Sequence, residues 1–221
     1  DPEMSRGLGD VYKRQEYYRV KELLDGKRPS RMDLFTYMDD EIYRICVSGS
    51  HAKENPFQHY LDFLYELGEL SEDEQKLYAG IGREFIQTIE TTEMQKVYKM
   101  PILYSFYNHG NIQLAVTDEE VLESWKEFFD TGTNWKDFPN VNTYEDYKKV
   151  TDKQHLSKAK RMPIRYLKAS GKGFFVEKDG YALALRDEIG DVVGNMAFGE
   201  QMGDVLGYRS LEYYRRRYKK E

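Results

Sequence analysis

Helix-start signals followed by helix-spaced apolar residues recur along this chain of 221 residues, and they constrain its fold most. A Ser or Thr followed three residues later by Asp or Glu is typical of a helix capping box. The pattern occurs at Ser30 with Asp33, Ser71 with Glu74, Thr117 with Glu120, and Thr143 with Asp146. Because apolar residues then recur every three or four positions, residues 16–97 are predicted to form a helical, bundle-like subdomain.

The apolar spacing changes after residue 98. Apolar residues alternate on both sides of Asn108-His109-Gly110-Asn111, which predicts a β-hairpin over residues 100–116. A second hairpin is predicted over residues 173–185, with Asp179-Gly180 at its turn. Two weaker helices, around residues 187–198 and 204–218, close the chain. We therefore expect a mostly helical α+β fold, with residues 98–221 forming an α+β subdomain whose hairpins are interleaved with helices in a winged-helix-like manner.

The first fifteen residues, DPEMSRGLGDVYKRQ, fit nothing that follows. The segment GLGDVYKRQ resembles translated sequencing-adapter read-through, so residues 1–15 are expected to be a disordered artefact. In that case the true N-terminus is missing, and the chain is the tail of a longer protein.

Tyr37-Met38-Asp39-Asp40 matches the YMDD motif of reverse transcriptases, whose paired aspartates hold magnesium. That chemistry needs the motif at a tight turn between two apolar strands, whereas Leu34, Met38, Ile42 and Ile45 follow the spacing of a single helix. A motif without its structural context is weak support. We therefore interpret these residues as an acidic helix turn that faces water.

No catalytic or metal-binding residue is predicted. The four histidines are scattered, and no phosphate-binding loop motif occurs. Glu177 and Asp179 leave a divergent nuclease open as a third alternative, although turn acids at a hairpin tip are the simpler interpretation. The lone Cys46 excludes an internal disulfide framework and indicates a reduced, cytoplasmic setting. No apolar run approaches the roughly 18 residues of a membrane span, so no membrane partner is expected.

The strongest functional signal is a row of basic residues. Nine Lys or Arg lie between Lys148 and Lys172, with Asp152 as the single acid. Residues 1–130 carry a net charge of −11 (15 basic, 26 acidic), whereas residues 131–221 carry +5 (18 basic, 13 acidic). The residues predicted to contact a nucleic-acid backbone are Lys158, Lys160, Arg161, Arg165, Lys168 and Lys172, with Arg215 and Arg216 near the end of the chain. The alternative is an ordinary solvated helix face that balances the acidic half of the molecule.

One short sequence recurs. Lys99-Met100-Pro101-Ile102 with Tyr104 is echoed by Arg161-Met162-Pro163-Ile164 with Tyr166, and a hairpin and a helix are expected after each. The echo allows a duplicated unit, although true repeats are self-similar over most of their period.

Several runs resemble the C-terminal region of bacterial superfamily-2 DEAD/DEAH-type DNA helicases, relatives of restriction-enzyme motor subunits. The runs are RPSRMDLFTYMDDEIY (28–43), ELSEDEQKLYAGIGREFIQTIE (69–90), YKMPILYSFYNHGNIQLAVTDEEV (98–121), SGKGFFVEKDGYALAL (170–185) and LEYYRRRY (211–218). The resemblance implies an accessory region that binds DNA and docks on motor domains upstream in the same chain. ATP and magnesium would belong to those motor domains, so no cofactor is expected here. The alternative is a non-catalytic protein-interaction module without nucleic-acid contact.

Overall fold

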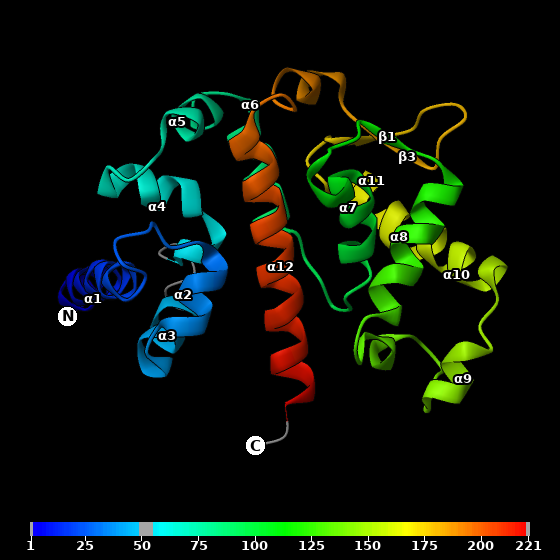
Figure 1. Ribbon diagram of the computed structural model, residues 1–221, viewed down its shortest axis with the longest axis horizontal. Coiled ribbons are helices and arrows are strands. Elements are labelled where there is room, and N and C mark those ends of the chain that lie inside the picture. Colours follow the sequence, from blue (N-terminus) through cyan, green and yellow to red (C-terminus); the bar gives the residue numbers. More distant parts are fainter. Residues whose placement is uncertain (1, 49–54, 220–221) are drawn as a thin grey trace. The chain divides into compact units, whose positions relative to one another are not determined.

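A computed structural model describes residues 2–48 and 55–219 of the chain (Figure 1). The fold is α+β and mostly helical, as the sequence predicts. The chain divides into two compact units, residues 1–91 and residues 92–221. The expected boundary lay later, between residues 97 and 98.

The described residues of the first unit form helices joined by turns and loops, with no strand among them. Its helices are α1 (Pro2–Leu23), α2 (Arg31–Tyr37), α3 (Asp40–Val47), α4 (Tyr60–Leu67), α5 (Glu72–Tyr78) and α6 (Ile81–Thr91), with a 3₁₀ turn at Pro56–Gln58. The capping boxes at Ser30 and Ser71 are both present. The apolar faces meet in a core that includes Tyr17, Val20, Leu34, Tyr60, Leu64, Leu77, Phe85 and Ile89.

Residues 2–15 are helical, which contradicts the expected disorder of this segment. Neither Gly nor Pro occurs from Asp10 to Leu23, so nothing ends the helix that Tyr17 and Val20 anchor in the core. The artefactual origin of the segment stays a prediction.

The YMDD residues span the junction of two helices, from Tyr37 at the end of α2 to Asp40 at the start of α3, and lie neither within one helix nor between two strands. Met38 ends α2, and Asp39 caps α3 by accepting hydrogen bonds from the main-chain N–H of Glu41 at 3.0 Å and of Ile42 at 3.2 Å. The main-chain N–H of Asp39 itself donates to the Glu16 carboxylate at 2.9 Å. The Asp39 carboxylate therefore has a structural role that accounts for its position.

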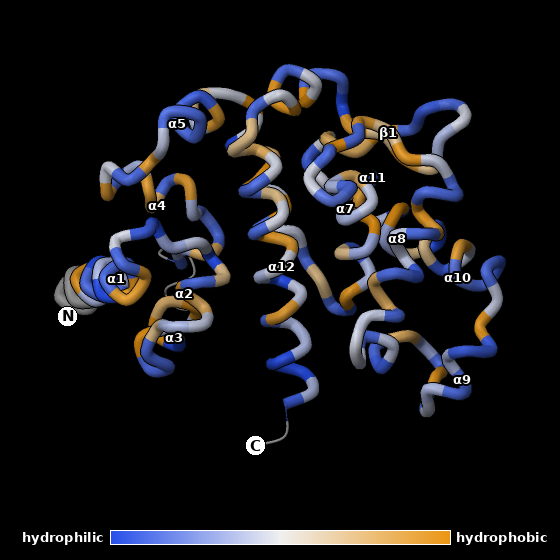
Figure 2. Tube along the Cα trace, in the orientation of Figure 1, coloured by the Kyte–Doolittle hydropathy of each residue, from blue (hydrophilic) through white to orange (hydrophobic). Residues whose placement is uncertain are grey.

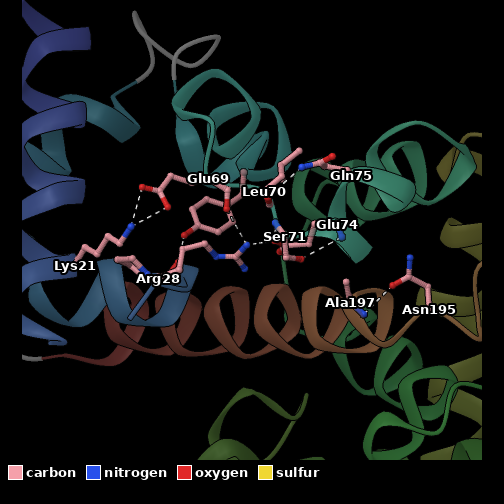
Figure 3. Close-up of polar contacts among 11 residues, drawn as sticks. Lys21, Arg28, Glu69, Leu70, Ser71, Glu74, Gln75, Asn195 and Ala197 are labelled. Atoms are coloured by element: carbon pink, nitrogen blue, oxygen red, sulfur yellow. Dashed lines mark hydrogen bonds and ion pairs between the residues drawn. The ribbon is translucent and has the colours of Figure 1, made fainter. Parts of the chain in front are cut away.

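Ion pairs join distant segments of the first unit. The Lys21 ammonium contacts both carboxylate oxygens of Glu69 at 2.9 Å, and Arg28 pairs with Glu74, the residue that also completes the capping box of α5 (Figure 3). These contacts fasten α1 and the loop after it to the α4–α5 connection.

A third ion pair is fully buried. The Arg31 guanidinium lies 3.1 Å from the Glu90 carboxylate and 4.8 Å from the centre of the Tyr60 ring. The main-chain N–H of Tyr60 donates to the same carboxylate at 3.1 Å. Burial raises the pKa of Glu90 to about 6, although the positive charge of Arg31 opposes that rise. The pair thus depends on having both partners present.

Replacing Glu90 with glutamine should leave the Arg31 charge buried without its counter-charge. Breaking a buried pair in this way costs about 3–5 kcal/mol. We expect Glu90→Gln to lower the free energy of unfolding of the first unit by this amount, measured by urea denaturation with circular dichroism. Glu84→Gln, at an exposed position of the same helix, is the matched control, and equal stability of the two variants would contradict the assignment.

The second unit packs helices around a small sheet. Its helices are α7 (Lys99–Tyr107), α8 (Asp118–Asp130), α9 (Tyr144–Lys148), α10 (Asp152–Ala159), α11 (Arg165–Ser170) and α12 (Met196–Tyr218), with 3₁₀ turns at Asn108–Gly110, Asn134–Asp137 and Asp187–Asp191. Helix α7 lies beside α8 and α12, and α8 lies beside α10 (Figure 1). Lys99 of α7 and Arg209 of α12 both bind the start of the unit, because each donates a hydrogen bond to Thr92.

The predicted hairpin over residues 100–116 is wrong, because residues 99–107 form helix α7. Ile102, Leu103 and Phe106 are all fully buried, so this helix has no polar face that would reveal its period. Only Ala115–Val116 forms a strand, β1.

The hairpin over residues 173–185 is confirmed in a shorter form. Strands β2 (Phe175–Val176) and β3 (Leu183–Leu185) pair antiparallel, with Phe175 opposite Leu185. Strand β3 also pairs with β1, which gives the strand order β1-β3-β2. The winged-helix-like description stays a prediction.

The end of the chain is one long helix, α12, and not the two helices expected. Gly203 does not interrupt it, because the helix backbone packs against Tyr107 there: an added Cβ would lie 2.5 Å from the Tyr107 hydroxyl. The last turns of α12 are hydrophilic (Figure 2), in agreement with Arg215, Arg216 and Arg217 in its final turn.

Candidate nucleic-acid interface

A groove of about 570 Å³ runs along α10 in the second unit. One wall is the turn at residues 138–141, and the other comes from α9, α10 and the turn after α10. Four of its lining residues are basic, Lys149, Lys153, Lys158 and Arg161, whereas Asp146 is its one acid. We call this the basic groove. Within the described part of the chain, no carboxylate pairs with Lys149, Lys153 or Arg161, so their charges are open to a ligand.

Local sequence places these cations on one face. The Thr151 capping box starts α10, and Lys153, Ser157 and Arg161 then recur at spacings of four, which aligns them along the helix. The opposite face carries His155 and Ala159, which are buried. The helix continues into a π-helical turn, Lys160–Ile164, that contains Pro163. Proline lacks the N–H that an α-helical bond would use, and single π turns often occur at functional sites.

His155 attaches α10 to the core. Its Nδ1 accepts a hydrogen bond from the Trp125 indole N–H at 3.2 Å, and its ring packs edge-on against Phe138 and Tyr147. Burial lowers the pKa of His155, and the positive charge of Lys126 lowers it further. The imidazole is therefore held neutral, with the proton on Nε2.

Asp137 organises the region around the groove. Its buried carboxylate accepts hydrogen bonds from the main-chain N–H of Val97 at 3.1 Å and from the hydroxyls of Tyr213 at 2.8 Å and Tyr218 at 2.6 Å. Its main-chain carbonyl accepts from the Tyr98 hydroxyl at 3.1 Å. Burial raises the pKa of Tyr218 to about 12, and the hydrogen bond to Asp137 adds to that rise, so the hydroxyl stays a donor.

Two further cations flank this carboxylate. Lys96 Nζ lies 3.9 Å and Arg217 Nε lies 3.5 Å from Asp137 Oδ1, and both side chains remain partly exposed. The Lys158 ammonium lies 5.4 Å from the centre of the Tyr98 ring. Burial lowers the pKa of Lys158, and the nearby charges of Arg161 and Lys96 lower it further. Cations from α10, from α12 and from the segment before α7 thus converge on one surface.

The structure separates the predicted contact residues. Only Lys158 and Arg161 line the basic groove. Three others pair with nearby acids: Lys160 with Asp118 at 2.6 Å, Lys168 with Glu177 at 2.9 Å, and Arg216 with Glu212 at 2.9 Å. Arg165, Lys172 and Arg215 are exposed but do not line the groove.

Four cations of this surface were not predicted from the sequence. Lys149 and Lys153 belong to the basic row. They precede Ser157 and Arg161 at spacings of four, so helical periodicity was a signal that identifies them. Arg217 lies next to the predicted Arg215 and Arg216. Lys96 had no local signal, because the Asp137 contacts join segments far apart in the chain.

Further observations bear on metal sites, nuclease chemistry and membrane spans. No group of three or more His, Cys, Asp or Glu that could hold a metal occurs in the described residues. Glu177, considered for a nuclease, pairs with Lys168, which lowers the pKa of its carboxyl. The helices at residues 2–48 and 55–219 include none with the length and apolar character needed to cross a bilayer. Comparison with protein families, curated proteins and solved structures found no match to this chain.

Because His155 is neutral in the folded protein, we expect the stability of the second unit to depend on pH. The folded pKa lies below the unfolded value of 6.5, so the unfolded chain binds more protons as the pH falls. The stabilisation is complete above pH 6.5 and is lost as the pH falls through the folded pKa. Urea unfolding monitored by tryptophan fluorescence from about pH 8 to 5 should show this loss, and His155→Gln should reduce the slope. His109→Gln changes an exposed imidazole, and an equal reduction there would contradict the assignment.

Proposed function

We propose that the second unit binds the phosphate backbone of a nucleic acid in the basic groove. The observation that carries this proposal is the convergence of Lys158 and Arg161, which line the groove, with Lys96 and Arg217, which approach from two other segments. Asp137, the acid beside Lys96 and Arg217, is fully buried and already bound by Tyr213 and Tyr218, whereas Asp146 is the one acid that lines the groove. A ligand therefore meets excess positive charge, as a phosphate backbone requires.

The depressed pKa of Lys158 supports an anionic ligand. Its ammonium is partly desolvated and faces two other positive charges, which disfavours the charged form. A phosphate near Lys158 and Arg161 would offset this repulsion. Such a contact would be favourable regardless of base sequence.

The alternative, an ordinary solvated basic face, applies to those predicted contact residues that lie outside the groove and have acidic partners. Lys160, Lys168 and Arg216 each have a carboxylate partner, so much of their charge is balanced locally. We therefore assign backbone contact to the groove residues and not to these three.

We further propose that the chain is the accessory C-terminal region of a cytoplasmic, ATP-dependent DNA helicase. The support is the resemblance over residues 28–43, 69–90, 98–121, 170–185 and 211–218. ATP and magnesium would then act on motor domains upstream, and DNA would be the polymer bound. The basic groove would hold DNA while another surface docks on those domains.

Neutralising the groove tests the binding proposal. Lys158→Gln/Arg161→Gln should weaken binding to duplex and single-stranded DNA of any sequence, measured by fluorescence anisotropy across a salt titration. For each phosphate that the variant no longer neutralises, the slope of log K against log salt should fall by about 0.9 on duplex DNA and about 0.7 on single strands.

Lys160→Gln/Lys168→Gln removes the same charge outside the groove and is the matched control. If the two double variants bind equally well, the groove is wrongly assigned. If the unaltered chain binds no DNA at low salt, the protein-interaction alternative is favoured.

A further inference from the structure

A second cleft in the second unit is lined by acidic and aromatic side chains, in contrast to the basic groove. It holds about 420 Å³ between α7, α8 and α12, within the usual size of small-ligand sites. Its aromatic wall consists of Tyr104 and Tyr107 of α7 and Phe128 of α8. The Tyr104 ring lies 6.0 Å from the Phe128 ring and 6.2 Å from the Tyr107 ring, centre to centre. The cleft thus offers a cluster of aromatic rings.

The polar wall of the cleft is acidic. Glu120, Glu123 and Glu127 follow one face of α8 at spacings of three and four, and none of the described lining residues is Lys or Arg. The Glu120 carboxylate already has a partner within the protein, because it accepts a hydrogen bond from the main-chain N–H of Thr117 at 3.0 Å. Glu123 and Glu127 are exposed, and like charges four residues apart repel each other on a helix. A bound cation would remove that repulsion.

The turn after α7 also lines the cleft, and its backbone is unusual. Asn108, His109 and Gly110 have successive positive φ angles of 48°, 53° and 95°. This turn places His109 Nε2 3.5 Å from Glu127 Oε2. Gly203 of α12 admits the Tyr107 hydroxyl so closely that no side chain would fit there. The Tyr107 ring is therefore packed against α12.

We propose that this cleft binds an organic cation, a guanidinium or primary ammonium group. Aromatic faces attract such groups, and carboxylates form charge-assisted hydrogen bonds with them. An aromatic wall beside Glu123 and Glu127 suits a planar guanidinium, which can stack and donate in pairs. The cation could belong to a free small molecule or to the arginine side chain of a peptide. The proposal is independent of nucleic-acid binding in the basic groove.

Isothermal titration calorimetry on the full chain tests the proposal with three probes. Agmatine carries a guanidinium and an ammonium, acetyl-Gly-Arg-Gly-amide carries an arginine side chain, and N-butylurea is a neutral counterpart. We expect agmatine to bind and N-butylurea not to bind. Binding of the peptide as well would identify an arginine side chain as a ligand, whereas binding of agmatine alone would identify a free small cation.

Variants assign the binding to the cleft. Glu123→Gln/Glu127→Gln should weaken agmatine binding by roughly tenfold or more, because neither side chain then carries the negative charge that strengthens its hydrogen bond. Tyr104→Leu should weaken it by removing an aromatic face. Glu119→Gln, an exposed acid of α8 outside the cleft, should leave the affinity unchanged.

Circular dichroism verifies that the glutamine variants keep their helices, as expected for exposed positions. The proposal is overturned if neither cation binds, if N-butylurea binds as well as agmatine, or if the folded double variant keeps the original affinity.

Discussion

The second unit depends on the buried carboxylate of Asp137. A buried charge is costly unless several donors satisfy it, and here the main chain at Val97 and the hydroxyls of Tyr213 and Tyr218 do so. Tyr213 is 76 positions from Asp137 in the sequence, so the contact fixes the end of α12 against the start of the unit. The same carboxylate positions Lys96 and Arg217 near Lys158. One buried acid thereby accounts for a surface of excess positive charge.

Helix α8 connects the two candidate sites of this unit. Trp125 on one face holds α10 through His155, and α10 carries the cations of the basic groove. Glu123, Glu127 and Phe128 contribute to the acidic cleft. Because a rigid helix bears both sets of contacts, each site is formed by packing that is already complete. The two sites can thus bind ligands of opposite charge without competing for the same side chains.

The sequence predicted features whose partners lie within one helical turn, but it did not predict contacts between distant segments of the chain. The capping boxes at Ser71 and Thr117 were predictable, because both partners lie within one helical turn. Residues 99–107 were mistaken for a strand, because burial on all sides hides the helical period. The two copies of the Met-Pro-Ile echo differ in local structure, since Pro101 sits in the first turn of α7 whereas Pro163 lies inside a π turn. Nothing near Asp137 in the chain predicted its partners, so Lys96 and Arg217 were not assigned to the cationic surface.

Hydrogen exchange on an Asp137→Asn variant tests the central role of this carboxylate most directly. Asparagine keeps the shape but removes the charge that three donors share. The account predicts faster amide exchange at residues 95–98 and in the last turns of α12, with α10 still protected by the Trp125–His155 contact. Unchanged exchange at residues 95–98 and 210–219 would contradict the claim that Asp137 holds these segments together.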